Sequence, residues 1–274
     1  MESISSHQNP RIKKLIQLHR SRGRQKQNRI AIFGSREIQR AISAGIDPQE
    51  LFICPQLVSP ETLDSIRRLN SGFESVAHSV TVELFEKICF GDRSDGIVMV
   101  ASRPELSIEK FTESLKSESP LIAIAENIEK PGNLGAILRS VDGAGVDGLI
   151  VADPATDWYH PNTIRASLGT CFSVQGCLSD TATVQSWLKR NDFQVIVASL
   201  QGAKDFFEFD LTGRTAIVLG NEANGVSDAW HAEHEMVAGK LPMLGIADSL
   251  NVSAAAAVMF YEARRQRLGI NRNA

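Results

Sequence analysis

The sequence has no apolar stretch long enough to cross a membrane. Its apolar runs, such as 121–125, 216–219 and 254–260, are short, whereas a membrane-spanning helix needs about 18–20 such residues. The basic residues near the N-terminus are not followed by an apolar stretch, so we expect no signal peptide. With 43% hydrophobic and 22% charged residues, the composition is that of a globular protein rather than a disordered or collagen-like chain.

Cysteine is scarce and is never paired in a CxxC pattern. The four cysteines, which we interpret as reduced thiols in a cytoplasmic protein, are Cys54, Cys89, Cys171 and Cys177. His231 and His234 stand three residues apart without an evident third ligand, so we expect a surface pair and no metal site. The sequence contains no P-loop or GxSxG motif, and the glycine-containing segment 127–145 does not match GxGxxG, so a nucleotide-hydrolysing, serine-hydrolase or classical dinucleotide-binding site finds no support there.

Charge is distributed very unevenly along the chain. Residues 1–40 hold ten Lys or Arg and two acids, a net charge of +8, which leaves −11 for the rest because the whole chain carries −3. A basic arm of this kind suits a polyanion, since each neutralised phosphate releases counterions. Charge alone leaves two interpretations open, a nucleic-acid surface and an ordinary solvated helical surface. The arm holds one aromatic residue, Phe33, which disfavours a platform that stacks bases.

Strand-like and helical patterns alternate through both halves of the chain, as in α/β folds. The polar stretch 102–118 separates the halves, so we predict a smaller α/β domain with the basic arm over 1–101, a linker with a short helix, and a second domain over 119–274. In the first half we predict strands at 30–33, 51–54, 75–77 and 96–101 and helices at 35–45, 59–70 and 82–88. In the second half we predict strands at 121–127, 148–152, 194–200 and 215–220 and helices at 133–145, 161–168, 184–190 and 249–268. Continuous apolar strands such as 121–127 are typical of a parallel sheet buried on both faces.

Three segments of the second half combine glycines with polar side chains, and the first is 127–145. Asn133 is placed to cap a helix, Gly135 lies in its first turn, and Arg139 follows one and two-thirds turns after Asn133. A strand, a glycine loop and a helix in this order can bind an anion through free backbone N–H groups. An ordinary crossover helix with one exposed arginine fits the same pattern.

The second and third segments lie further along the chain. In 219–227, Gly220 and Gly225 allow tight turns, and Glu222 lies at the carboxyl end of a predicted strand, where open α/β sheets bind ligands. A plain strand-to-helix turn is the alternative and, for this segment alone, the better one. In the third segment, 241–257, Ser249 or Asn251 can cap the final helix. A capped core helix is the alternative there, but it leaves the cluster of amide, hydroxyl, Pro and Met unexplained.

Together the segments resemble the SpoU (TrmH-like) family of SPOUT RNA 2′-O-ribose methyltransferases. The family's motifs occur in the same order, as N-x-G-x-x-x-R at 133–139, G-N-E-x-x-G at 220–225 and P-M-x-G-x-x-x-S-L-N-V-S at 242–253. Residues 165–169 are similar to the family's R-A-S-x-G segment. The resemblance covers about 119–270, and 1–100 resembles more loosely the family's small substrate-binding domain, a ribosomal-protein-like α/β module.

The resemblance implies a fold, a cofactor and an assembly. The fold is a parallel sheet with a deep trefoil knot, and the assembly is a homodimer through the knotted domain. The cofactor is S-adenosyl-L-methionine, bound in the knotted loops. Its implied contacts are Leu200, Gly220, Asn221, Glu222, Gly225, Leu241, Pro242, Met243, Ser249 and Leu250. The implied catalytic residues are Arg139, Asn133, Glu222, Asn251 and Ser253. Leu241 replaces the usual Ile, and Ala223 replaces a common Gly and should stiffen its loop.

Arg139 is the residue on which the implied reaction depends most. A free guanidinium has a pKa above about 12 and is a poor base. Two roles therefore stay open: Arg139 positions the adjacent phosphate and stabilises the developing alkoxide, or it acts as the base after a large fall in its pKa. No metal is needed for either role.

The basic arm and the small domain would bind RNA through its phosphates and its shape. The expected RNA contacts are Arg11, Lys13, Lys14, Arg22, Arg24 and Arg165. We favour rRNA over tRNA, because a separate N-terminal domain is typical of the rRNA-acting members. Two other functions stay open: a non-catalytic RNA-binding assembly factor, and a methyltransferase of the same fold that acts on a base nitrogen.

Overall fold

The computed structural model describes residues 1–91, 95–200, 204–230 and 236–269 and divides the chain into two compact units. Unit 1 comprises Met1–Glu105 and Asp157–Ser173, and unit 2 comprises Leu106–Thr156 and the described residues from Val174 onward. The prediction that all of 119–274 forms one domain is wrong in one respect: residues 157–173 belong to unit 1. No helix among the described residues is both long and apolar enough to cross a membrane.

Unit 1 is built on a mixed sheet of five strands in the order β1-β4-β3-β5-β2. Its strands are β1 (Glu2–Ile4), β2 (Arg29–Phe33), β3 (Pro48–Ile53), β4 (Ala77–Val80) and β5 (Ile97–Ser102). Its helices are α1 (Pro10–Gln17), α2 (Ser21–Gln27), α3 (Ser35–Ser43), α4 (Pro60–Leu69), α5 (Phe73–Val76), α6 (Val82–Ile88) and α9 (Pro161–Ala166), followed by the 3-10 turn Thr170–Phe172. β5 is antiparallel to both β2 and β3, while β1 and β3 run parallel to β4. Most predicted elements of the first half are confirmed, but 75–77 is wrong as a strand because α5 continues to Val76.

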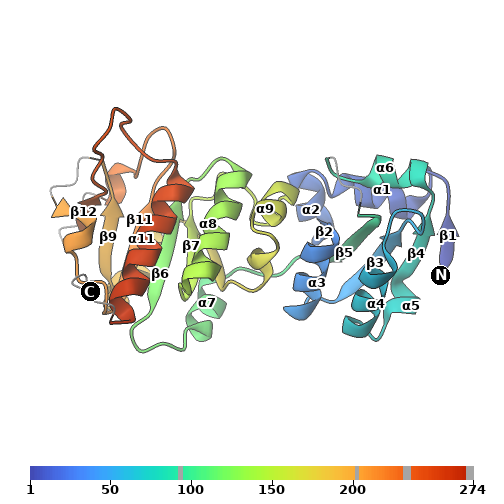
Figure 1. The fold of residues 1–274 in the computed structure, drawn as a ribbon, viewed down its shortest axis with the longest axis horizontal. Coiled ribbons are helices and arrows are strands. Elements are labelled where there is room, and N and C mark those ends of the chain that lie inside the picture. The colour runs from blue at the N-terminus through green and yellow to red at the C-terminus, as the bar shows by residue number, and fades with distance from the viewer. Residues whose placement is uncertain (92–94, 201–203, 231–235, 270–274) are drawn as a thin grey trace. The chain divides into compact units, whose positions relative to one another are not determined.

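The basic N-terminal segment is an integral part of unit 1 rather than a free arm. Asn9 caps α1 by accepting a hydrogen bond from the backbone N–H of Arg11, and Pro10 fits the first helical position. Ile12 and Leu15 lie three residues apart, face the sheet, and are buried in one cluster with side chains of α6. Figure 1 shows α1 and α6 side by side along this sheet. The charged residues of α1 are therefore confined to its solvent face.

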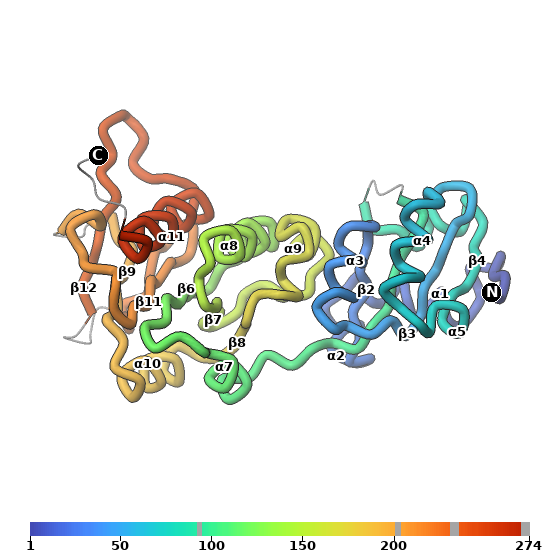
Figure 2. The backbone as a smooth tube through the Cα atoms, turned by 60° about the horizontal axis from the view of Figure 1, so that its bottom comes forward, coloured from blue at the N-terminus to red at the C-terminus, as the bar shows by residue number. Residues whose placement is uncertain are grey.

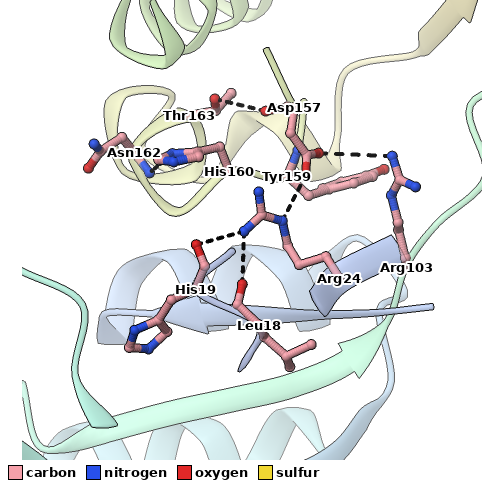
Figure 3. A network of polar contacts seen from close by, with 9 residues as sticks. All are labelled: Leu18, His19, Arg24, Arg103, Asp157, Tyr159, His160, Asn162 and Thr163. Atoms are coloured by element: carbon pink, nitrogen blue, oxygen red, sulfur yellow. Dashed lines mark hydrogen bonds and ion pairs between the residues drawn. The ribbon is translucent and has the colours of Figure 1, made fainter. Parts of the chain in front are cut away.

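A buried ion pair joins the segment 157–173 to α2 (Figure 3). The Arg24 Nε donates to Asp157 Oδ2 at 2.7 Å, and Arg24 Nη1 donates to two backbone carbonyls between α1 and α2 at 2.8 and 3.1 Å. Arg103 brings a second guanidinium to 3.9 Å from Asp157 Oδ1. The Arg24 and Asp157 side chains are 1% and 9% exposed. A buried arginine needs such partners. Asp157 supplies the negative charge, although it lies 133 residues further along the chain.

Unit 2 contains a sheet of seven strands in the order β10-β12-β9-β11-β6-β7-β8, with every neighbouring pair parallel. The strands are β6 (Leu121–Glu126), β7 (Gly148–Ala152), β8 (Gly176–Ser179), β9 (Gln194–Ala198), β10 (Lys204–Asp205), β11 (Thr215–Leu219) and β12 (Met236–Lys240). The central strands β6, β7 and β11 are buried along their whole length. This confirms the parallel sheet predicted from their continuous apolar runs.

Helices cover both faces of the unit 2 sheet. They are α7 (Ile108–Ser114), α8 (Pro131–Ala144), α10 (Thr181–Arg190) and α11 (Val252–Arg267), and short 3-10 turns lie at Phe206–Glu208 and Asp228–Trp230. Figure 2 shows α8 and α11 on one face and α7 and α10 on the other. The short helix expected in the linker is α7, and it is part of the core: Phe111 is buried and meets Trp187 edge-on, with ring centroids 5.7 Å apart.

Two predicted caps have different outcomes. Asn251 caps α11 by accepting a hydrogen bond from the backbone N–H of Ser253, as the sequence indicated. The prediction that Asn133 caps α8 is wrong: the helix begins at Pro131 with Lys130 in the cap position. A proline favours the first helical position because it has no N–H to lose there. Asn133 therefore lies within the first turn, and its side chain is available to other partners.

Candidate functional site

A pocket of about 630 Å³ opens where the parallel strands of unit 2 end. The segments after β9, β11 and β12 and the first turns of α11 line it. The carboxyl ends of parallel strands are the usual ligand site of open α/β sheets. Of the predicted cofactor contacts, the pocket is lined by Leu200, Gly220, Asn221, Glu222, Gly225, Leu241, Met243, Ser249 and Leu250. Pro242 is the predicted contact that does not line it.

The loop after β11 folds back on itself immediately at Gly220. A Cβ at this position would lie 2.2 Å from the backbone carbon of Gly225, so no side chain fits without moving the backbone. Asn221 and Gly225 exchange two backbone hydrogen bonds of 2.9 Å across the turn, and Gly225 has a φ of +71°. The two glycines of the motif are thus explained by the shape of the loop.

Asn221 uses its whole amide group to hold this loop in place. Its Nδ2 donates to the backbone oxygen of Asn127 at 3.0 Å and to Glu129 Oε1 at 3.1 Å. Its Oδ1 accepts from the backbone N–H groups of Ala223 and Asn224 at 2.8 and 3.1 Å. Asn127 has a φ of +49°, a conformation that asparagine tolerates better than most residues. Asn221 therefore borders the pocket while its side chain is occupied by structural bonds.

Four of the five predicted catalytic residues form one hydrogen-bonded chain. Asn133 Nδ2 donates to Glu222 Oε1 at 2.5 Å, and Asn251 Nδ2 donates to Asn133 Oδ1 at 3.3 Å. Ser253 completes the chain, with its hydroxyl donating to Asn251 Oδ1 at 2.6 Å. Glu222 and Asn251 line the pocket directly. Residues from α8, from the loop after β11 and from the start of α11 thus meet at one edge of the pocket.

Arg139 is the predicted catalytic residue that the structure does not bring into this pocket. It is exposed on α8 and does not line the cavity. It lies six positions after Asn133 in the helix, which turns its side chain about 120° away from that of Asn133 around the helix axis. Within the described part of the chain, Arg139 has no hydrogen bond or ion pair. Its side chain therefore faces solvent beside the chain of polar residues rather than inside it.

The predicted RNA contacts divide into exposed and buried residues. Lys13 and Lys14 on α1, Arg22 on α2 and Arg165 on α9 are exposed. Arg11 is half-exposed and forms an ion pair with Glu50 at 3.0 Å. Arg24 is a correction: its guanidinium is buried and paired with Asp157, so it is unavailable to a phosphate. This burial was not predictable from the sequence, because the partner lies 133 residues further along the chain.

The pocket has chemical features that fit S-adenosylmethionine. Its volume lies within the range of about 300–1,000 Å³ that is usual for small-molecule sites. Apolar side chains such as Leu219 and Met259 supply contact area for a base, while Glu222 and Asp228 offer negative charge for an ammonium or sulfonium group. Lys130 offers the opposite charge for a carboxylate.

Four of these pocket residues, Lys130, Leu219, Asp228 and Met259, were not among the predicted site residues. Lys130 could have been predicted from the sequence, because this residue directly precedes the proline that starts α8. Asp228 and Met259 have no distinguishing sequence signal, since they lie outside the three motifs.

The described residues contain no group of three His, Cys, Asp or Glu side chains that could hold a metal ion. His231 and His234 lie outside the described residues. Burial raises the pKa of Cys171 and that of Cys177 to about 12, so both remain thiols near neutral pH and are poor nucleophiles.

Comparison with known proteins identifies the family. Residues 120–261 match the SpoU rRNA Methylase family, and residues 9–99 match the MRM3-like substrate binding domain. The first match covers more than half of the chain, so the chain belongs to the SpoU rRNA methylase family, a class of S-adenosylmethionine-dependent RNA 2′-O-methyltransferases. The resemblance stated from the three motifs is confirmed.

Individual relatives resemble different extents of the chain. The 23S rRNA (uridine(2479)-2′-O)-methyltransferase of Streptomyces viridochromogenes is 30% identical over 86% of this chain and 83% of its own length. The tRNA (guanosine(18)-2′-O)-methyltransferase of Thermus thermophilus is 38% identical over 61% of this chain and 86% of its own length. The crystal structure of the SpoU methyltransferase AviRb from Streptomyces viridochromogenes with the cofactor AdoMet is 27% identical, with a TM-score of 0.84 over 95% of this chain and 99% of that one.

Proposed function

We propose that this chain transfers a methyl group from S-adenosylmethionine to a ribose 2′-oxygen of structured rRNA, through the pocket of unit 2. The observation that carries the proposal is the contact between Glu222, which lines the pocket, and the chain of Asn133, Asn251 and Ser253. A pocket bordered by neutral amides and by the Glu222 carboxylate that they hold suits positioning of a hydroxyl group beside a bound methyl donor. The alternatives of tRNA, of a base nitrogen and of a non-catalytic RNA-binding factor are outcomes of the test below.

The chemistry divides between the cofactor and the protein. When bound, S-adenosylmethionine supplies an activated methyl group on a sulfonium. The protein orients the reactants: Glu222 holds Asn133, and Asn133 in turn accepts from Asn251 at the edge of the pocket. Arg139 keeps the two roles stated above, as a cation that stabilises the developing alkoxide and its phosphate or as the base itself.

We assign RNA binding to the exposed Lys and Arg side chains of unit 1. Residues 10–27, which span α1 and α2, hold seven Lys or Arg and no acid. Within residues 10–27, the exposed basic side chains without a hydrogen bond or ion pair to a described residue are Lys13, Lys14, Arg20, Arg22 and Lys26. Such a surface neutralises phosphates without selecting a sequence, which fits recognition of RNA by shape. The proposal favours rRNA, since the Streptomyces viridochromogenes relative resembles this chain over both units and is named for 23S rRNA, whereas the tRNA enzyme resembles 61% of it.

We also propose a homodimer through the face that α8 and α11 share. Leu244 and Ile246 in the loop after β12 are almost fully exposed, and Tyr261 of α11 is half-exposed with its hydroxyl over Gly143 of α8. Exposed apolar side chains of this size are candidate contacts for a partner chain. Gly143 lies one turn after Arg139 on the same helix face, so a dimer here brings Arg139 beside the partner chain.

The knot and the compartment are proposed on separate grounds. Strand β11 lies between β9 and β6, and the segments after β9, β11 and β12 meet at one pocket, an arrangement that suits the family's deep trefoil knot. The thiols of Cys54, Cys171 and Cys177 are free and buried, which suits work in the reducing cytoplasm.

The test compares the wild type with Arg139→Ala. Calorimetry measures S-adenosylmethionine binding, and labelled cofactor measures transfer to separate pools of unmodified rRNA and tRNA. We expect both proteins to bind the cofactor and only the wild type to transfer label. Arg190→Ala, an exposed arginine on the opposite face of the sheet, is the matched control and should transfer normally. Wild-type turnover by Arg139→Ala, or its loss of cofactor binding, would refute the role of Arg139. Absence of cofactor binding by the wild type would favour an RNA-binding factor.

A further inference from the structure

A buried carboxylate stands at the end of β6, within the apolar stretch that the sequence analysis assigned to a strand. Glu126 is 3% exposed and belongs to none of the three motifs. Both of its oxygens accept hydrogen bonds from one residue: the backbone N–H of Ser227 reaches Oε2 at 2.8 Å, and the Ser227 hydroxyl reaches Oε1 at 2.6 Å. Bonds to a charged acceptor are about twice as strong as neutral ones. Glu126 is thus committed chiefly to one partner.

Ser227 ends the loop whose preceding residues line the pocket. Gly220 to Val226 border the cavity, and Asn221 ties the start of this loop to Asn127 and Glu129. Ser227 ties its end to Glu126. Both anchors therefore lie in the short segment 126–129, which leads from β6 into α8.

A second neighbour of Glu126 has a different function. The Thr181 hydroxyl lies 2.7 Å from Asp153 Oδ2 and 3.3 Å from Glu126 Oε1. The Thr181 hydroxyl has a single proton to donate, and Asp153 is the nearer acceptor. Thr181 therefore donates its hydrogen bond chiefly to Asp153. The bond from Thr181 leads into α10 and does not touch the pocket loop. A change at Thr181 therefore disturbs the same buried cluster without touching the loop.

We propose that Glu126 is a positioning residue for the cofactor: through Ser227 it holds residues 220–227 in the conformation that forms the pocket. The inference rests on the proposed function for the identity of the ligand. If the anchor is removed, the loop spends time in conformations that do not bind, and the apparent affinity falls with the fraction that does. At saturating cofactor, residues 220–227 return to the conformation that forms the pocket, and Glu222 again accepts the hydrogen bond from Asn133. The affinity for the cofactor should therefore fall while kcat is retained.

The test uses two variants that break the anchor and two that preserve it. Glu126→Gln replaces the charged acceptor by an amide, and Ser227→Ala removes the hydroxyl that donates to Glu126. Because Ser227 is exposed, Ser227→Ala folds even if Glu126→Gln does not. Ser227→Thr keeps the hydroxyl, and Thr181→Val is the control for the buried cluster. Loss of one hydrogen bond to a charged group predicts a rise of about tenfold in the dissociation constant for S-adenosylmethionine, measured by calorimetry.

Two further readouts separate positioning from a merely structural role. In the cofactor-free protein, the amide of Ser227 should exchange its hydrogen faster in Glu126→Gln and Ser227→Ala than in the wild type. At saturating cofactor, kcat of both should stay within about twofold of the wild type, and Ser227→Thr and Thr181→Val should match the wild type in all readouts.

Three results would overturn the proposal: unchanged affinity and exchange in both anchor variants, an equal loss of affinity in Thr181→Val, or a fall in kcat without a change in affinity. If the wild type itself fails to bind the cofactor, the proposed function fails instead, while the exchange of the Ser227 amide still tests the anchor.

Discussion

The ion pair between Arg24 and Asp157 makes a quantitative prediction about unit 1. Asp157→Asn keeps the shape of the side chain but leaves the Arg24 guanidinium buried without a counter-charge. Removing one partner of a buried pair costs about 3–5 kcal/mol. Arg24 keeps two backbone carbonyl acceptors, so we take the lower end, about 3 kcal/mol. A unit of this size has a total stability of roughly 6–18 kcal/mol, so the loss is a substantial part of it.

Native-state hydrogen exchange of the amides in α1 and α2 measures this loss. A decrease of about 3 kcal/mol corresponds to exchange roughly a hundredfold faster or more. Asp180→Asn is the matched control, because Asp180 caps α10 of unit 2 and asparagine also caps helices well. The double variant Arg24→Met/Asp157→Leu should recover most of the stability, since apolar pairs replace buried ion pairs at little cost. An acceleration below about fivefold in Asp157→Asn, or an equal one in Asp180→Asn, would refute the reasoning.

Three further predictions concern the pocket, the RNA surface and pH. Gly220→Ala should weaken S-adenosylmethionine binding by more than about a hundredfold in calorimetry, because its Cβ meets backbone atoms. Gly213→Ala, whose Cβ would meet open space, should bind normally, and equal binding by both would contradict this explanation of the loop. Lys13→Gln/Lys14→Gln should reduce the slope of log affinity for RNA against log salt by about 1.5–2, and an unchanged slope would exclude this surface. Burial holds the pKa of His19 below its ordinary value of 6.5. As the pH falls below about 6.5, His19 is therefore protonated more readily in the unfolded chain than in the folded one. Melting of unit 1 should therefore shift to lower temperature as pH falls below about 6.5, and His19→Gln should lessen the shift.

Elements that carry their own local signal were predictable from the sequence. The apolar runs of β6, β7 and β11 predicted a buried parallel sheet, and Asn251 was placed correctly at the start of α11 because capping is a local interaction. The short strands β8 and β12 were missed, since four or five partly polar residues in a strand have no distinctive periodicity.

Interactions between distant residues were not predictable in the same way. Arg24 and Glu126 were treated as a surface base and as part of an apolar strand, and both are buried by partners more than a hundred residues away. The three motifs did predict which residues gather at the pocket, because each follows a predicted strand or opens a predicted helix. They did not predict that the side-chain amide of Asn221 is occupied by hydrogen bonds that hold the loop, or that Arg139 lies outside the pocket of its own chain.

The most direct test of the central claim is the position of the transferred methyl group. A 2′-O-methyl group blocks alkaline cleavage of RNA at that nucleotide, because the 2′-hydroxyl is the attacking group. After incubation with labelled S-adenosylmethionine and unmodified rRNA, alkaline hydrolysis should leave the label in a dinucleotide that resists cleavage. Label recovered in a mononucleotide with a methylated base would contradict a ribose methyltransferase and favour transfer to a base nitrogen.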